Sequence, residues 1–444
     1  MKRARLVALA NPPTSQYSGN WSTPLSRSDW LQGSFYTDLG RLLERGCFDM
    51  VFLADALAIP EDANGDIATT LRTGGKGAIY LDPIVGLSHI AAATTHLGLG
   101  ATVSTTFQPP FSIARSLLSL DHLSGGRVAW NIVTSTTDAE AQNFGRDRIP
   151  DRVARYNYAD EVVQSVLDLW DGWEPDALTL DADQRLFADP SKVRRAPRRN
   201  GRPALSRGPL AMPRSPQGRP VLMQAGASPR GLEFAARWAE VVFATTSSAD
   251  TMRSQRAALR ARAADLGRDP DSILYLPAIQ PILGSTEADA RRRLQTLQDS
   301  LDPTEVLVSL GRLLKATPPE LVPHASAAAL VIAHRGATGS DGFERSMLET
   351  AESENLTVLE LAFRQALSQF NLQPVGTPAE VADALEDMLD GDAADGFVVM
   401  PALYLSSFED VVNGLVPELQ RRGRLRREYR SATLRENLAL GAPT

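Results

Sequence analysis

Short apolar runs alternate with amphipathic stretches along most of this chain. The apolar runs predict strands, and they read RLVALA, FDMVFLAD, LGATVS, RVAWNIVTS, RPVLMQAG, VVFATTSS, ILYLPAIQPIL and DGFVVMPA. The stretches between them predict helices; in RYNYADEVVQSVLDLW, one face collects Ala159, Val162, Val163, Val166 and Trp170 at helical spacing. Strands that alternate with helices are expected to be parallel, because a tight turn cannot join a parallel pair.

The number of strand–helix units indicates the fold class. About eight strand candidates predict an α/β protein with a TIM-type (β/α)8 barrel, and a doubly wound open sheet is the alternative. Two stretches, about 174–217 and 302–356, fall outside the repeat and predict insertions in a single domain that spans residues 1–444. Long insertions in a compact domain are often lids or binding loops.

Charge and cysteine content exclude several classes of partner. The formal net charge of -7 gives no global attraction to nucleic acid or to anionic lipid. No apolar run approaches the ~20 residues of a membrane-spanning helix. The single cysteine, Cys47, cannot form an internal disulfide, so we expect a reducing, cytoplasmic location.

The first predicted insertion carries a basic segment. Eight Arg or Lys residues and no acidic residue lie between Lys192 and Arg214. The segment has no aromatic residue that could stack on a base, and the chain as a whole is acidic. It is therefore interpreted as a solvated or subunit-packing arm rather than as a nucleic-acid site.

The residues that follow the predicted strands are rich in hydroxyls and amides. In a TIM-type barrel these positions line the active site. They are Asp55, Thr102–Thr106, Asn131, Thr134–Thr136, Gln224–Ser228 and Thr245–Ser248. The five histidines have no ligand spacing and there is no second cysteine, so no metal site is predicted. No G-x-S-x-G motif supports a Ser–His–Asp hydrolase, and no catalytic residue is assigned.

Such strand ends suit a site that holds a polar cofactor and leaves the chemistry to it. In QAGASPRG, Gly226 lets the backbone approach a ligand, and Ser228 can cap a helix from Pro229 whose free amides favour a phosphate. A capped helix without a ligand explains this stretch equally well. Tyr156 can donate its hydroxyl to a phosphate or simply pack. Asp55 can accept a hydrogen bond from a cofactor or cap the segment after it.

Several ordered motifs together resemble one known family. They include LLERGCFDMVFLAD, HLGLGATVSTTFQPPFSIARSLLSLDHLSGGRVAWNIVTS, RYNYADEVVQSVLDLWDGW, GPLAMPRSPQGRPVLMQAGASPRG and DGFVVMP. Nearly end to end, the chain resembles the two-component flavin monooxygenases of the bacterial luciferase-like superfamily. This family is typified by nitrilotriacetate monooxygenase, dibenzothiophene sulfone monooxygenase and the pristinamycin synthase large subunit.

The resemblance implies a TIM-type barrel that uses FMN in its reduced form, FMNH2, with O2 as co-substrate. A separate NAD(P)H-dependent flavin reductase would supply the FMNH2, and a C4a-peroxyflavin would oxygenate a small organic substrate. A homodimer or homotetramer is expected. Two alternatives stay open: deazaflavin-dependent hydride transfer on the same barrel, and a non-catalytic flavin-binding member. The long STTFQPPFSIARSLLSLDHLSGGR block favours the monooxygenase.

The resemblance also assigns site residues. It implies that Asp55, Thr102 and Ser104 lie along the isoalloxazine and ribityl parts of the flavin, and that Tyr156 and Ser228 bind its phosphate. Arg152 stands four residues before the tyrosine, where many members carry a histidine, and a guanidinium suits phosphate binding. The segment before GPL and the region of residues 17–21 also depart from the family pattern, so no relative's substrate is transferred to this chain.

Overall fold

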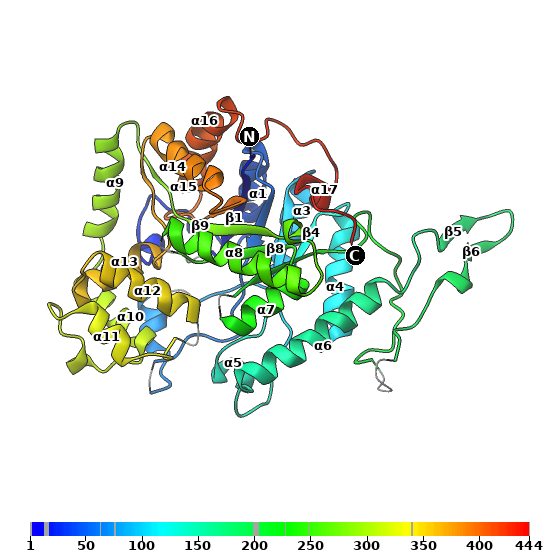
Figure 1. Cartoon of the computed structure of the whole chain (residues 1–444), viewed down its shortest axis with the longest axis horizontal. Coiled ribbons are helices and arrows are strands. Elements are labelled where there is room, and N and C mark those ends of the chain that lie inside the picture. Colours follow the sequence, from blue (N-terminus) through cyan, green and yellow to red (C-terminus); the bar gives the residue numbers. More distant parts are fainter. Residues whose placement is uncertain are drawn as a thin grey trace.

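A closed barrel of parallel strands forms the centre of the molecule (Figure 1). The computed structural model describes residues 2–12, 17–62, 64–74, 77–198, 204–226, 228–246, 248–338 and 341–443. Within these residues eight strands close in the order β1-β12-β9-β8-β7-β4-β3-β2. The predicted TIM-type barrel is confirmed, and the open-sheet alternative is wrong because β1 pairs with both β2 and β12. The division into a single domain with two insertions stays a prediction.

Each predicted apolar run contains one barrel strand. The barrel strands are β1 (Arg5–Ala10), β2 (Met50–Leu53), β3 (Gly98–Ser104), β4 (Val128–Val133), β7 (Val221–Ala225), β8 (Val241–Ala244), β9 (Leu274–Ile279) and β12 (Gly396–Val399). The helices between them are α1 (Gly33–Arg45), α2 (Ala68–Thr73), α3 (Pro83–Ala93), α4 (Pro110–Leu123), α5 (Asp138–Asn143), α6 (Arg152–Trp170), α7 (Pro229–Trp238), α8 (Ala249–Asp265) and α14 (Pro378–Asp390). After β12 come α15 (Ser406–Asp410), a π-helical turn (Val411–Leu415), α16 (Val416–Arg421) and α17 (Leu434–Asn437).

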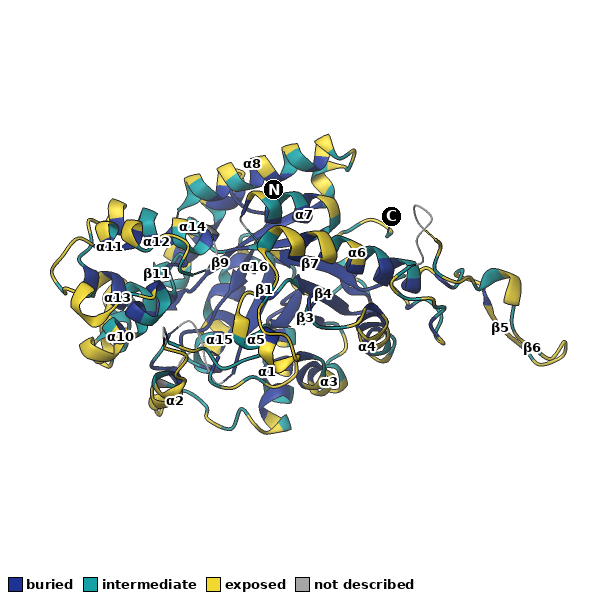
Figure 2. Cartoon of the chain, turned by 90° about the horizontal axis from the view of Figure 1, so that it is seen from below, coloured by how far each residue is buried: buried dark blue, intermediate teal, exposed yellow. Residues whose placement is uncertain are grey.

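Two apolar layers explain why the strands are hydrophobic on both sides. On β1, Leu6 and Ala8 pack toward the surrounding helices, whereas Val7 and Leu9 face the barrel interior. Alternate residues of a strand point to opposite faces, so a closed sheet wrapped in helices needs apolar residues at every position. Figure 2 shows these strands as the buried centre of the molecule.

Arg127, in the turn before β4, connects four elements at the amino ends of the barrel strands. Its guanidinium donates to the carbonyl oxygens of Ser124 (2.7 Å), Leu97 (2.7 Å), Ala91 (3.0 Å) and Thr94 (3.0 Å), and to Thr94 Oγ1 (2.8 Å). The side chain is 2% exposed. Arg127 therefore ties the ends of α3 and α4 to the starts of β3 and β4, the two strands that carry Thr102 and Asn131.

The chain between α6 and β7 contains a hairpin that projects from the body of the molecule (Figures 1 and 2). It consists of β5 (Leu178–Asp181) and β6 (Leu186–Ala188), which pair antiparallel. In the basic segment beside it, Lys192 pairs with Asp176, and Arg194 Nη2 lies 2.7 Å from Glu174 Oε1. These cations are thus compensated by acidic residues that precede the segment in the chain.

The chain between β9 and α14 contains a group of helices at one side of the barrel (Figure 1). It comprises β10 (Ile282–Leu283), α9 (Glu287–Asp299), α10 (Pro303–Leu314), α11 (Ala327–Ala333), α12 (Asp341–Ser353), α13 (Val358–Ser368) and β11 (Val375–Gly376). Helices α10 to α13 share a small apolar core of their own, which includes Leu310, Leu330 and Leu361. The helical character of this stretch was not evident from its Ala-, Pro-, Ser- and Gly-rich composition. No described helix is long and apolar enough to cross a membrane.

Candidate functional site

The polar residues predicted at the ends of β2, β3, β4 and β7 lie along four neighbouring strands of the barrel. Asp55 follows β2, Thr102 and Ser104 end β3, Asn131 lies on β4, and Ser228 follows β7. These strands are consecutive in the order β7-β4-β3-β2. Because neighbouring strands lie about 4.8 Å apart, the four ends span roughly 15 Å of the barrel rim. They form a continuous polar arc that can hold an extended ligand.

The middle of the polar arc is a buried hydrogen-bond network between β3 and β4. Asn131 Nδ2 donates to Thr102 Oγ1 at 2.9 Å, and the hydroxyls of Ser104 and Ser135 share a hydrogen bond of 2.9 Å. Thr102 and Ser104 are each 3% exposed. Below them, Gly100 leaves room for Phe52, whose ring packs 5.7 Å from that of Phe243. The network therefore lies on an apolar floor.

The structure brings Tyr156 and Ser228 together at the β7 end of the arc. Ser228 caps α7, since its Oγ accepts a hydrogen bond from Gly231 N at 3.0 Å, and its hydroxyl lies near that of Tyr156. A Cβ placed on Gly231 would lie 3.0 Å from that hydroxyl, and one placed on Gly226 would lie 3.2 Å from it. The two glycines thus keep a backbone cradle open beside a tyrosine hydroxyl and a helix N-terminus.

Three arginines lie near this cradle, and one of them, Arg230, is paired with Asp160. The tyrosine ring lies under Arg230, whose guanidinium carbon is 5.6 Å from the ring centroid. Burial raises the pKa of Tyr156, while the charges of Arg152, Arg155 and Arg230 act in the opposite direction. Arg155 is 9% exposed, and its Nε has no partner among the described residues. A helix N-terminus with arginines beside it is a favourable environment for an anion.

Asp55 lies at the opposite end of the arc, beside other carboxylates. Burial raises its pKa from 3.8 to about 6, a hydrogen bond from Ala56 N–H lowers it, and the carboxylates of Asp82 and Glu140 raise it further. The arc is therefore polarised, with cations at its β7 end and a carboxyl that is easily protonated at its β2 end.

We expect Asp55→Asn to stabilise the flavin-free protein at pH 8 by about 2 kcal/mol. Between about pH 4 and pH 6 the native carboxyl, with its pKa of about 6, keeps its proton, whereas the same carboxyl in the unfolded chain has released it. The stability of the native state is therefore lost as pH rises through this range, and the asparagine variant does not lose it. Urea unfolding at pH 4 and pH 8 tests this, with Asp183→Asn in the exposed hairpin turn as control. An equal gain in the free energy of unfolding at both pH values would show that titration of Asp55 is not the cause.

Four buried polar atoms at the same mouth of the barrel have no hydrogen-bond partner among the described residues. They are Asn131 Oδ1, Gln224 Oε1, Thr246 Oγ1 and Gln280 Nε2. An unpaired buried polar atom costs about 1–3 kcal/mol, so a ligand that pairs with such atoms would gain affinity. The pattern of strand ends pointed to Asn131, Gln224 and Thr246 as mouth residues, whereas Gln280 was missed because it ends an unbroken apolar run.

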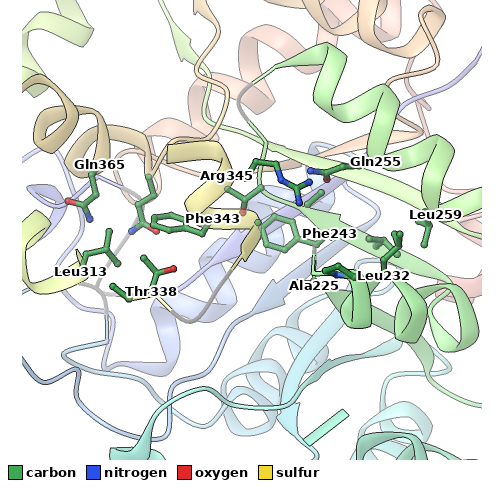
Figure 3. A pocket seen from close by; sticks show the side chains of 18 of the residues that line it. Ala225, Leu232, Phe243, Gln255, Leu259, Leu313, Thr338, Phe343, Arg345 and Gln365 are labelled. Carbon is green, nitrogen blue, oxygen red and sulfur yellow. The ribbon is translucent and has the colours of Figure 1, made fainter. Parts of the chain in front are cut away.

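A cavity of about 700 Å³ adjoins the β7 end of the arc. Its barrel wall includes Gly226 and Phe243, and its outer wall comes from α10, α12 and α13. Figure 3 shows Phe343 and Leu313 on the outer side, facing the barrel residues across the cavity. Asp55, Thr102, Ser104, Arg152, Tyr156 and Ser228 are not among its described lining residues. The cavity and the polar arc are thus neighbouring spaces.

A TIM-type barrel with a polar arc and a deep cavity at the carboxyl ends of its strands defines an enzyme architecture. The chain matches the family of luciferase-like monooxygenases over residues 28–395, and it belongs to that family. The resemblance inferred from the motifs is confirmed. The protein is therefore a flavin-dependent monooxygenase, an oxidoreductase that acts on a small organic substrate.

Relatives match this chain over almost its whole length. The dibenzothiophene-sulfone monooxygenase of Rhodococcus erythropolis is 40% identical, over 96% of this chain and 94% of the relative. Nitrilotriacetate monooxygenase component A of Aminobacter aminovorans is 34% identical, over 96% of this chain and 94% of the relative. The crystal structure of a riboflavin lyase with modified FMN and riboflavin superposes with a TM-score of 0.86 at 32% identity, covering 98% of this chain and 96% of the lyase.

The deazaflavin alternative has only distant structural support. An F420-dependent secondary alcohol dehydrogenase superposes with a TM-score of 0.55 at 14% identity, and this likeness shows the shared fold alone. The family match therefore favours oxygen insertion over hydride transfer to a deazaflavin.

Proposed function

We propose that the polar arc binds FMN, with the phosphate in the cradle at β7 and the ring system toward β2. The observation that carries this proposal is the pairing of Tyr156 with Ser228 at the N-terminus of α7, beside Arg152. Helix amides, hydroxyls and guanidinium groups are the donors that a phosphate requires.

The rest of the arc suits the uncharged parts of the flavin. Thr102 and Ser104 offer hydroxyls to the ribityl chain, and the carboxyl of Asp55 offers an acceptor to a ring N–H or a hydroxyl. The unpaired Asn131 Oδ1 and Gln224 Oε1 are further acceptors at the same mouth. A ligand with many donors and acceptors and a terminal phosphate matches this set of residues, so the chain fits FMN.

FMN in its reduced form would supply the chemistry by activating O2, so that one oxygen atom enters the substrate and the other leaves as water. The protein's part is to position the flavin and the substrate and to exclude water from the site. The apolar floor of Phe52 and Phe243 keeps solvent from the inner side of the flavin site. The cavity walled by α10, α12 and α13 is large enough for a small organic substrate.

The proposal includes a partner. A protein that consumes reduced FMN needs a source of it, and we assign this role to a separate NAD(P)H-dependent flavin reductase in the cytoplasm. The relative named as component A of nitrilotriacetate monooxygenase supports a multi-component arrangement. A homodimer or homotetramer stays a prediction, and the projecting hairpin with exposed Leu180 and Phe187 is a candidate contact.

Rapid mixing of the anaerobic protein and FMNH2 with oxygenated buffer tests the function. We expect an absorbance transient that outlasts the reoxidation of free FMNH2 by about tenfold or more, because bound flavin is shielded from water. Equilibrium dialysis in parallel measures the fraction of flavin bound. Reoxidation at the free rate with flavin fully bound, both without substrate and across a substrate panel, would contradict the monooxygenase and leave the non-catalytic flavin-binding alternative.

A further inference from the structure

The charged residues of the cavity are unevenly distributed. Among its described lining residues, Arg312, Lys315 and Arg345 are cationic and Glu61 is the one acidic residue. All three cations come from the α10–α13 group of helices, opposite the barrel wall. Cations gathered on one wall of a recessed space attract an anion and hold it at that wall.

Two of these cations form no ion pair with the described residues. Arg345 forms no hydrogen bond or ion pair within the part of the chain that the structure describes, and Figure 3 shows its guanidinium reaching toward Phe243 and Gln255. Arg312 donates to Thr70 Oγ1 and forms no ion pair with the described residues; burial lowers its pKa, and the charge of Asp62 acts in the opposite direction. A guanidinium without a carboxylate is available to pair bidentately with a ligand anion.

The other lining residues are mainly apolar or neutral donors. Phe243 and Phe343 supply aromatic surface from the two walls, and Leu313 and Leu232 supply aliphatic surface. Gln255 Oε1 accepts a hydrogen bond from the Tyr275 hydroxyl at 2.9 Å, which leaves its amide NH2 group as a donor. The cavity thus combines an apolar body with donors near one end.

We propose that the substrate is an organic anion, with an apolar or aromatic body between Phe243 and Phe343 and a carboxylate or sulfonate group bound by Arg345 and Arg312. This assignment rests on the proposed function, since it concerns the cavity beside the proposed flavin site. The anion can have two sources here, the substrate or the phosphate of FMN, and the test separates them.

Calorimetric titration of the FMN-free full chain with 4-biphenylcarboxylate and with 4-biphenylcarboxamide tests the proposal, since the two probes differ only in charge. We expect the carboxylate to bind about tenfold more tightly, as one charge-assisted hydrogen bond predicts. Arg345→Gln should abolish this preference, and Arg345→Lys should restore part of it. Arg335→Gln removes an exposed arginine from the same group of helices, outside the described lining, and should change nothing.

Fluorescence titration of FMN into the same variants identifies the source of the anion. We expect the FMN affinity of Arg345→Gln to stay within about twofold of the wild type. A loss of FMN affinity parallel to the loss of carboxylate preference would assign Arg345 to the cofactor phosphate and overturn the proposal. Equal binding of acid and amide to the wild type, or a preference that survives Arg345→Gln, would overturn it too. Failure of the wild type to bind FMN would overturn the proposed function, whereas the acid–amide comparison judges the cavity by itself.

Discussion

Replacing Arg127 with methionine is expected to lower the free energy of unfolding by about 4 kcal/mol. Methionine fills a similar volume but donates no hydrogen bond, so four buried carbonyl oxygens lose their donor. Each unpaired buried carbonyl costs about 1–3 kcal/mol, and the removal of a buried charge that forms no ion pair with the described residues offsets part of the sum.

Urea unfolding measures this effect as a lower midpoint with an unchanged slope. Arg115→Met on the exposed face of α4 is the matched control, and it should change stability by less than ~0.5 kcal/mol. Arg127→Lys should lose less than the methionine variant, because an ammonium reaches some of the same carbonyls. A midpoint for Arg127→Met equal to that of Arg115→Met would show that the turn before β4 does not depend on these bonds.

The second large effect concerns flavin affinity. Ser228→Ala and Tyr156→Phe each remove one hydroxyl from the cradle at the N-terminus of α7, and each should weaken FMN binding by about tenfold, since a hydrogen bond to a charged group contributes ~1.5 kcal/mol or more. The two hydroxyls lie close together, so their losses are not expected to be additive. Fluorescence titration with FMN measures both affinities.

Ser248→Ala is the control that distinguishes loss of a phosphate contact from loss of a helix cap. Ser248 caps α8 as Ser228 caps α7, with its Oγ accepting a hydrogen bond from Thr251 N at 3.2 Å. Loss of either cap should cost about 1 kcal/mol of stability. Only Ser228→Ala should also weaken FMN binding. Riboflavin, which has no phosphate, should bind equally well to the Ser228→Ala and Ser248→Ala variants. Unchanged FMN affinity in Ser228→Ala would remove Ser228 from the phosphate site.

The proposed site is assembled from residues that differ in how visible they are in the sequence. Ser228 lies in a recognisable cap, and Thr102 and Asn131 follow apolar runs that could only be strands. The pattern around Tyr156 fits packing and binding alike; the structure shows the packing, since its ring lies edge-on to Phe234, and binding of a phosphate stays a prediction. Arg345 had no local signal at all, because an exposed arginine on a helix has the same pattern whether or not a cavity lies beside it.

By itself the sequence determined the eight barrel strands and the helices between them outside α10–α13, because hydrophobic periodicity is a property of neighbouring residues. It also determined the family, since the ordered motifs extend over nearly the whole chain. Only the tertiary structure decided that the sheet closes, because β1 meets β12 across almost the full length of the chain. Only the tertiary structure placed α10 and α12 against the barrel mouth, where their arginines line the same cavity as Phe243. Such contacts depend on the packing of distant segments, and no local pattern of residues encodes them.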